Sequence, residues 1–328
     1  MSNNIKQNQI ASIVGATATG KTAFALQLAK LLLSDKHYQK IHLLSADSRQ
    51  VYCDLENLTG ADVPSDFTKH KTEQFDYPFF QNEDKNIFLH GVSIIEPTEE
   101  WSVAHFQQLF INIKNNLGEN DFLLVVGGTG FYQQQVLETA ENIYIPQNHS
   151  LRENLEKLSV TELQNELSEL DKIKLQSMNN SDLNNPRRLI RAIEIIHFTT
   201  KHPNFLTKQS ANILPIFYLQ INKETREQKI RQRVTERFEL AKVEVDKQLK
   251  LGQSNTLAAS STGFAELSKF IQGEIDQITC LELWQTAEIQ YAKRQDTWWK
   301  KRPNLILIDP NDINIKINQA KILQACYI

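Results

Sequence analysis

Short apolar runs alternate with helix-like segments along the first half of the chain. Ile10–Val14, Leu43–Ala46 and Phe122–Val126 have the length and composition of buried strands. Ala23–Leu33, which follows the first run, repeats apolar residues at helical spacing. Because strands and helices alternate, we predict an α/β fold with a parallel sheet.

The pattern becomes helical in the middle of the chain and returns to α/β near the end. Leucines recur at helical spacing between residues 151 and 170, so we predict a helical insertion over residues 150–206. Four elements are predicted to complete the core, namely strand Ile213–Ile221, helix Lys223–Leu251, helix Thr279–Lys300 and strand Leu305–Ile308. The polar segment Ser65–Asn86 is predicted to be a surface loop or a small insertion.

The loop after the first strand carries a phosphate-binding motif. Its sequence, GATATGKT, matches GxxxxGK[ST] and lies between a predicted strand and a predicted helix, as a P-loop requires. Backbone amides, the helix N-terminus and the lysine suit a di- or triphosphate, and the last threonine suits its Mg²⁺. The residues predicted to hold the phosphates are Gly15, Ala16, Thr17, Ala18, Thr19, Gly20, Lys21 and Thr22, with Thr22 at the metal.

Two other segments should meet this loop. Ligands of open α/β sheets bind beyond the carboxyl ends of the strands, so Asp47–Tyr52 and Gly127–Tyr132 are predicted to share its crevice. A P-loop NTPase or kinase usually ends a second strand in an Asp that helps to hold Mg²⁺, whereas FLLVV here runs into GGTGFY. Asp47 is the available carboxylate. It suits a helix cap or a general base, and a position facing the P-loop favours the base.

Charge and composition narrow the function further. The net charge is −3, yet residues 186–250 contain 14 Lys and Arg against 7 Asp and Glu. This local excess suits either a nucleic-acid surface or solvated helix faces. Cys53, Cys280 and Cys326 stand far apart, so neither a disulfide framework nor a zinc module is indicated. Residues 1–9 are polar and no run approaches the ~20 apolar residues of a membrane span, which predicts a cytoplasmic protein without membrane contact.

Five motifs together resemble one family. They are GATATGKT (Gly15–Thr22), SADSRQVY (Ser45–Tyr52), GGTGFY (Gly127–Tyr132), NNPRRLIRAIE (Asn184–Glu194) and YAKRQDTWW (Tyr291–Trp299). In order and spacing they resemble the tRNA dimethylallyltransferase family, over nearly the whole chain. The resemblance implies a P-loop NTPase-like core of residues 1–140 and 211–328, with a parallel sheet flanked by helices. Residues 141–210 would form a helical insertion domain that contacts tRNA.

The resemblance also implies a reaction. Enzymes of this family transfer a dimethylallyl group from dimethylallyl diphosphate to the exocyclic amine of the adenosine 3′ to the anticodon, which forms i6A. The P-loop would hold the diphosphate with Mg²⁺ instead of ATP. Asp47 would act as the general base, Thr129 would lie by the diphosphate, and Arg237 would clamp it. Arg233 lies one turn earlier on the same helical face and is either functional or part of a surface ion pair.

Contacts with the anticodon stem-loop of tRNA follow from the same resemblance. An adenine that is splayed out of a loop is recognised by stacking and by hydrogen bonds to its edge, for which Ser48 and Gln50 are well placed. The residues implied for the RNA backbone are Arg187, Arg188, Arg191, Lys293, Arg294 and Gln295. Trp298 and Trp299 are predicted to be core or interface aromatics, and the protein is expected to be a monomer.

The chain departs from the family pattern at two places near the predicted site. Leu58–Asp62 keeps a threonine where the family usually has GTAKP, but it lacks the Lys-Pro. Glu288–Gln290 stands where the family usually has Thr-Arg-Gln. These changes bear on RNA docking more than on the chemical centre.

Three other functions stay open. An adenylate isopentenyltransferase would share the P-loop and Asp47 but would modify a free nucleotide, so the helical insertion and basic helices favour tRNA. A P-loop kinase or NTPase would turn over ATP without a prenyl donor. A non-catalytic RNA-binding descendant would not need Asp47.

Overall fold

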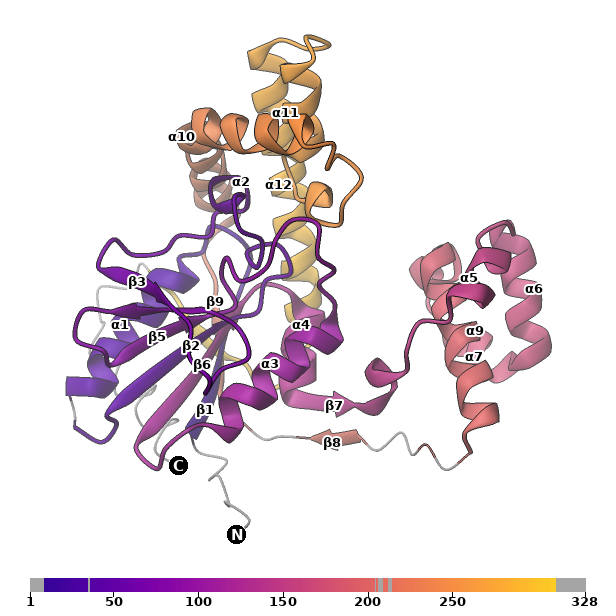
Figure 1. Ribbon diagram of the computed structural model, residues 1–328, viewed down its shortest axis with the longest axis horizontal. Coiled ribbons are helices and arrows are strands. Elements are labelled where there is room, and N and C mark those ends of the chain that lie inside the picture. Colours follow the sequence, from indigo (N-terminus) through magenta and orange to yellow (C-terminus); the bar gives the residue numbers. More distant parts are fainter. Residues whose placement is uncertain (1–8, 35, 204, 206–208, 212–213, 311–328) are drawn as a thin grey trace. The chain divides into compact units, whose positions relative to one another are not determined.

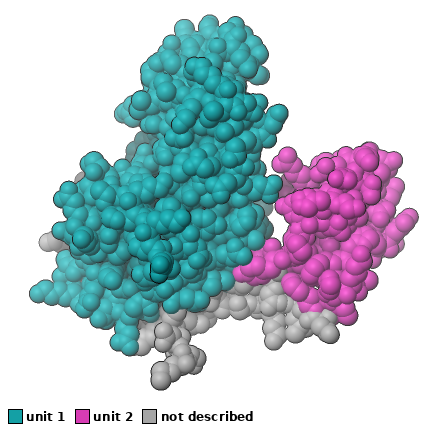
Figure 2. All heavy atoms as spheres, viewed as in Figure 1, with its two compact units in different colours: residues 1–137, 212–328 teal, residues 138–211 magenta. Residues whose placement is uncertain are grey.

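The computed structural model describes residues 9–34, 36–203, 205, 209–211 and 214–310. The chain folds as two compact units, one formed by residues 1–137 and 212–328 and the other by residues 138–211 (Figure 2). The first unit is a β-sheet packed against helices, and the second consists mainly of short helices (Figure 1).

The sheet of the first unit is mostly parallel. Its strands are β1 (Ile10–Val14), β2 (Lys40–Ser45), β3 (Phe67–His70), β4 (Phe79–Asn82), β5 (Ile87–His90), β6 (Asp121–Gly127), β9 (Ile216–Leu219) and β10 (Ile306–Ile308). Within the described residues the order is β10-β9-β1-β6-β2-β5-β4-β3. Neighbours from β10 to β5 pair in parallel, and β4 and β3 pair antiparallel at one edge.

The central strands are apolar because both faces of the sheet are covered. The helices of this unit are α1 (Lys21–Ser34), α2 (Glu56–Thr59), α3 (Val103–Asn115), α4 (Gly130–Leu137), α10 (Lys223–Lys250), α11 (Phe264–Ile271) and α12 (Gln277–Trp299). Side chains of a strand alternate between faces. Leu124 of β6 therefore joins the cluster that contains Leu28 of α1, whereas Leu123 joins the cluster that contains Phe106 of α3.

The long helix α10 packs against neighbouring helices through one apolar stripe. Ile230, Val234, Phe238, Ala241 and Val245 recur every three or four residues and are buried. They pack in the same cluster as residues of α11 and α12. The opposite, charged face of α10 is exposed, which explains how so polar a sequence forms a stable helix.

The second unit has its own small core. A ribbon of β7 (Glu138–Ala140) and β8 (Gln209–Ala211) leads to α5 (His149–Leu155), α6 (Val160–Leu170), α7 (Lys172–Ser177), α8 (Asn180–Leu183) and α9 (Pro186–Lys201). Leu163 and Leu167 of α6 pack on Leu189 and Ile193 of α9. Each helix begins at a side chain that accepts a backbone N–H, namely Asn148, Ser159, Asp171, Asn179 and Asn185.

The predicted α/β core with a helix-flanked parallel sheet is confirmed, and so are the long helix and the helical insertion. Of the two alternatives for Ser65–Asn86, a surface loop or a small insertion, the loop is wrong, because this segment contains β3 and β4. In β3 three of four residues are exposed, as an edge strand allows, so it lacks an apolar pattern. The predicted strand Ile213–Ile221 is β9; Ile213 and Cys326 lie outside the described residues. None of the described helices has the length and apolar composition to cross a membrane.

A buried histidine pair joins β2 to β5. His42 Nδ1 lies 3.0 Å from His90 Nε2, and His42 Nε2 lies 3.7 Å from Asp121 Oδ2. Phe88 stacks on His42, with ring centres 4.6 Å apart, and Phe75 packs against His90 at 4.9 Å. Burial lowers the pKa of His42 and lowers that of His90 well below its ordinary value, so both rings are neutral in the fold.

We predict that acidification below pH 6.5 destabilises this unit. In the unfolded chain each histidine takes up a proton near its ordinary pKa of 6.5, whereas the folded pair stays neutral to lower pH. The free energy of unfolding should therefore fall by up to about 1.4 kcal/mol per pH unit for each histidine. Urea unfolding between pH 7.5 and 5 measures this slope.

Two variants identify the source of the slope. His90→Gln removes one buried titrating ring and should flatten the pH dependence. His149→Gln, at an exposed position in α5, should leave it unchanged. Equal slopes in the wild type and His90→Gln would exclude the buried pair as the cause.

Candidate functional site

The loop with the predicted phosphate-binding motif, called the phosphate loop below, lies between β1 and α1, and its own side chains close it. Lys21 Nζ donates to the Ala16 carbonyl oxygen at 2.7 Å, and Thr19 Oγ1 donates to the same oxygen at 2.9 Å. Gly15 has a φ of +153°, and a Cβ there would stand 2.7 Å from the Leu219 carbonyl oxygen. Burial lowers the pKa of Lys21 to about 8, and the charge of Asp47 opposes this shift. The lysine is thus a half-buried cation with no ion-pair partner among the described residues.

A cavity of about 750 Å³ opens above the loop. Each of the three segments predicted to share a crevice contributes to its wall, at the carboxyl ends of β1, β2 and β6. The residues are Thr17, Ala18, Gly20, Lys21 and Thr22 of the loop, Asp47–Gln50 after β2, and Gly127 at the end of β6; Gly128–Tyr132 of the predicted segment are not part of the wall. Residues of α10 and α12 close the other side.

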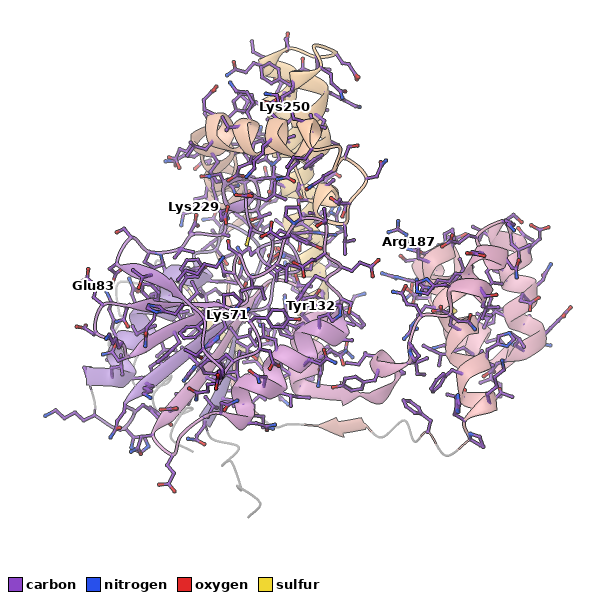
Figure 3. The ribbon with its side chains drawn as sticks, in the orientation of Figure 1. Lys71, Glu83, Tyr132, Arg187, Lys229 and Lys250 are labelled. Carbon is purple, nitrogen blue, oxygen red and sulfur yellow. The ribbon has the colours of Figure 1, made fainter. Side chains whose placement is uncertain are left out.

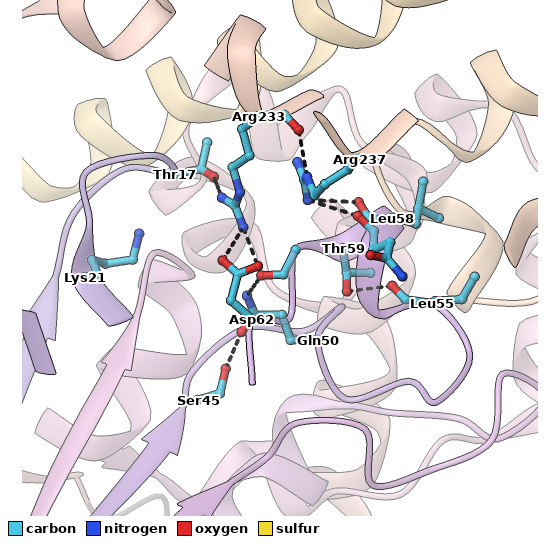
Figure 4. Close-up of polar contacts among 12 residues, drawn as sticks. Thr17, Lys21, Ser45, Gln50, Leu55, Leu58, Thr59, Asp62, Arg233 and Arg237 are labelled. Carbon is cyan, nitrogen blue, oxygen red and sulfur yellow. Dashed lines mark hydrogen bonds and ion pairs between the residues drawn. The ribbon is translucent and has the colours of Figure 1, made fainter. Parts of the chain in front are cut away.

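Arg233 of α10 ties the phosphate loop to the turn after α2. Its Nη2 donates to the Gly60 carbonyl oxygen at 2.9 Å and lies 3.4 Å from Asp62 Oδ2, and its Nη1 lies 3.4 Å from Thr17 Oγ1 (Figure 4). The side chain lines the cavity. Arg233 therefore fits both alternatives, because it forms an ion pair and also lines the cavity.

Arg237 lies one helical turn further and is buried deeper. It donates to the carbonyl oxygens of Asn57, at 3.1 Å, and Arg233, also at 3.1 Å (Figure 4). Its guanidinium lies over the ring of Trp284, 5.8 Å from the ring centre. Burial and the charge of Arg233 lower the pKa of Arg237 to about 10, so it remains a cation at neutral pH.

Gly60 is the point where these side chains meet. Its carbonyl oxygen accepts hydrogen bonds from Arg233 and, at 3.0 Å, from Gln50 Nε2. It caps α2 with a φ of +65°, and a Cβ would stand 1.9 Å from Arg233 Nη2 and 2.4 Å from Arg237 Nη1. Gln50 is held at its other end by Ser45, whose hydroxyl donates to Oε1 at 2.8 Å. Glycine is therefore required for both its backbone conformation and its lack of a side chain.

Asp47 both caps a turn and faces the cavity. Its Oδ1 accepts the backbone N–H of Arg49 at 2.9 Å, and the residue lines the cavity beside Ser48. Tyr291 of α12 lies close by: burial, followed by the charge of Asp47, raises its pKa to about 12. The second carboxylate oxygen of Asp47 is thus available to accept a proton or a hydrogen bond.

Helix α12 braces the phosphate loop. Gln295 is buried, and its Oε1 accepts the backbone N–H of Thr17 at 2.8 Å. A Cβ at Gly128 would stand 2.2 Å from Gln295 Nε2, and one at Gly130 would stand 2.2 Å from the Trp298 ring. The observed contact of Gln295 is with the loop, and its predicted contact with tRNA stays a prediction.

The other aromatic and polar residues of these motifs pack nearby. Trp299 is fully buried, as expected of a core aromatic. Asp296 pairs with Arg226 and accepts the Tyr218 hydroxyl at 3.1 Å. Thr129 is half-buried and lies beside Tyr291, and it is not one of the residues that line the cavity.

The arginines predicted to contact RNA differ in their surroundings. In the second unit, Arg191 bonds to Glu194 at 3.1 Å and to the Ile145 carbonyl oxygen at 2.7 Å, so it holds the unit together. Arg188 pairs with Asp182. Arg187 projects into solvent, with no partner among the described residues (Figure 3).

Helix α12 presents the remaining basic residues. Lys293 and Arg294 are exposed, and Arg294 lies over the Tyr291 ring, 5.6 Å from its centre, where it lines the cavity. Both are accessible to a ligand outside the protein, as RNA contacts would require.

Several residues of the cavity wall were given no role from the sequence. Among them are Arg49, which donates to the Leu257 carbonyl oxygen at 2.8 Å, Lys229 of α10, and Glu288 of α12. A signal exists for Lys229, because it precedes Arg233 by four residues and shares its helical face. Arg49 lies in the segment that was predicted to share the crevice, and Glu288 was noted only as a departure from the family pattern.

Few of the described side chains in the cavity could bind a metal ion. No group of three or more His, Cys, Asp or Glu in the described part of the chain could hold one. The Thr22 side chain lines the cavity next to Lys21. This donor set fits Mg²⁺, which keeps several waters and binds mainly through substrate phosphates.

Comparisons with known proteins agree on one family. A family model described as IPP transferase matches residues 80–302. A tRNA dimethylallyltransferase 2 of Treponema denticola is 32% identical, over 90% of this chain and 92% of that protein.

Two solved structures are similar over most of this chain. A full-length tRNA isopentenylpyrophosphate transferase of Bacillus halodurans superposes with a TM-score of 0.62 and 25% identity, over 98% of this chain and 97% of that one. A eukaryotic dimethylallyltransferase acting on tRNA gives a TM-score of 0.74 at 20% identity, over 96% and 77% of the two chains, which shows likeness of fold.

We predict that Gly60→Ala weakens binding of Mg²⁺-pyrophosphate at least tenfold. The new methyl group displaces Arg233 and Arg237, and a charge-assisted contact to phosphate contributes about 1.5–3 kcal/mol. Gly252→Ala is the matched control, because Gly252 has a similar φ of +71° but nothing within 4 Å of its Cβ position. Calorimetric titration that finds equal affinity in the two variants would contradict the role of this turn.

Proposed function

Because this chain belongs to the IPP transferase family, we propose that it transfers a dimethylallyl group from dimethylallyl diphosphate to a tRNA adenosine. The acceptor is the exocyclic amine of the adenosine 3′ to the anticodon, and the product is i6A. One observation carries the proposal: a phosphate loop, two arginines and the Asp47 carboxylate meet in a single cavity.

The donor would lie with its diphosphate on the loop. Loop amides, Lys21 and Arg237 suit the phosphate oxygens, and Thr22 would hold Mg²⁺. Bound there, Mg²⁺ neutralises charge on the diphosphate. Apolar side chains also line the cavity, namely Leu43, Leu58, Leu89, Val92 and Val126. They would suit a five-carbon prenyl tail better than the polar sugar of ATP.

The chemistry asks for cations at the leaving group and for a base at the amine. The carbon–oxygen bond of the donor breaks, its electron pair leaves with the diphosphate, and a carbon–nitrogen bond forms to the adenine. Lys21 and Arg237 stabilise the departing oxygens. Asp47 accepts the proton that the amine loses. The family resemblance assigns Thr129 to the diphosphate. Because Thr129 lies beside Tyr291, it would have to act without direct contact with the diphosphate.

The acceptor is proposed to be the anticodon stem-loop of a tRNA, bound by a monomer. Ser48 lies at the cavity wall, where a flipped adenine could be read. Gln50 would have to exchange its bond to Ser45 or Gly60 in order to contact the base. Exposed Arg187, Lys293 and Arg294 are the best candidates for backbone contacts.

One assay separates this function from its rivals. Labelled dimethylallyl diphosphate and Mg²⁺ are incubated with unmodified tRNA or with AMP, and ATP hydrolysis is followed in parallel. Transfer to tRNA alone supports the proposal. Transfer to AMP identifies an adenylate isopentenyltransferase, ATP turnover without transfer identifies an NTPase or kinase, and tRNA binding without any turnover identifies a non-catalytic binder.

We predict that Asp47→Asn lowers kcat about a hundredfold or more while donor affinity changes little. Asparagine keeps the hydrogen bond from Arg49 and removes the charge, and a positioned base contributes about 10²–10⁴-fold. Single-turnover transfer to a stem-loop RNA at saturating donor isolates this step. Turnover within about threefold of wild type would leave Asp47 as a cap only.

We also predict that replacing Arg187 and Arg188 by Glu weakens tRNA binding and flattens its salt dependence. Each lost phosphate contact reduces the slope of log K against log salt by about one. Diphosphate binding should be unchanged. Lys201→Glu, an exposed site at the other end of α9, is the control for charge alone, and an equal loss there would show a non-specific effect.

A further inference from the structure

A carboxylate of α12 lies opposite the two arginines of the cavity and has no role in the proposed reaction. Glu288 lines the cavity together with Tyr291 of the same helix. The residues around Glu288 indicate what it can do.

The charged neighbours of Glu288 come from three elements. Arg237 and Arg233 face it from α10, Asp47 from the segment after β2, and Tyr291 from α12 itself. Arg237 gives hydrogen bonds to the backbone carbonyl oxygens of Asn57 and Arg233. The Glu288 carboxylate therefore acts on this guanidinium through space and is free to change its charge without breaking those bonds.

Opposing effects act on the pKa of the Glu288 carboxyl group. Burial raises the pKa of Glu288, and the charge of Asp47 raises it further, whereas Arg237 and Arg233 lower it. Glu288 in turn favours the charged form of Arg237. The ionised carboxylate thus depends on the two arginines being free of other anions.

We propose that Glu288 is a positioning residue for Arg237 and Arg233, and that it takes up a proton when a diphosphate binds to these arginines. In the empty cavity the carboxylate balances the two guanidinium groups. A bound diphosphate takes over that balance and repels the carboxylate, which gains one proton from solvent. No other bond forms or breaks. The inference rests on the proposed function only for the diphosphate site.

The direction of the pH dependence follows from this coupling. Protonated Glu288 accompanies the bound state, so affinity for the diphosphate is highest at low pH. It falls as the pH rises between the pKa of Glu288 in the free site and its pKa in the complex. In that window the loss reaches about tenfold per pH unit, beyond any titration of the ligand.

Calorimetric titration with Mg²⁺-pyrophosphate at pH 7.5 tests the coupling. The apparent heat is measured in two buffers of different ionisation enthalpy, and its dependence on buffer gives the number of protons taken up. We expect the wild type to take up more protons than Glu288→Gln, by up to about one for this single site. The pH dependence of affinity should also be shallower in the variant. Titration of the ligand itself contributes equally to both proteins.

Two further variants serve as controls for this measurement. Glu288→Thr repeats the test if the glutamine variant unfolds, as judged from its melting temperature. Asp62→Asn removes a carboxylate that also lies by Arg233 but has a side chain that is 70% exposed. Its affinity is expected to change little and its proton uptake to stay at the wild-type value, because water screens an exposed carboxylate, which also lacks the desolvation that drives the coupling.

The outcomes separate this inference from the proposed function. Equal proton uptake in the wild type and both Glu288 variants overturns the inference even if prenyl transfer to tRNA is observed. Absence of pyrophosphate binding also overturns it. Greater uptake in the wild type supports it even if the transfer assay fails, in which case the proposed function alone falls.

Discussion

The hydrogen bond from the Thr17 N–H to the Gln295 side chain joins the phosphate loop to α12, and the arrangement of the site depends on it. The helix can approach this closely because Gly128 and Gly130 have no side chains to meet Gln295 and Trp298. Further along the helix, Trp299 is buried in the core. With α12 fixed in this way, the residues one and two turns earlier, Tyr291 and Glu288, must face the cavity.

A second constraint brings α10 to the same place. Arg233 and Arg237 both reach the turn that ends at Gly60, and a single methyl group there would meet both guanidinium groups. The two arginines lie more than a hundred residues after the loop and the turn in the sequence. The site therefore exists only when the first unit is fully folded. Donor binding should therefore report on the packing of α10 and α12 as well as on the loop.

The sequence predicted those elements that have a local periodicity or motif. The phosphate loop, the buried strands and the stripe of α10 were foreseeable because periodicity and motif are local. The edge strand β3 was missed because it buries only Phe67. The contacts of Gln295 and Arg191 within the protein could not be predicted either. In the sequence, a polar side chain that stabilises the fold cannot be distinguished from one that binds RNA. Only tertiary contacts distinguish these cases.

The two departures from the family pattern have one structural effect in common. Asp62 and Glu288 replace other residue types, and both place a carboxylate near the arginine pair. The exposed Asp62 adds little, because water screens its charge. Glu288 is different, because it offsets the cost of keeping Arg237 charged away from water. In the proposed diphosphate complex the same charge opposes the ligand. The carboxylate therefore stabilises the empty site at a cost in diphosphate affinity, and its proposed protonation relieves that cost.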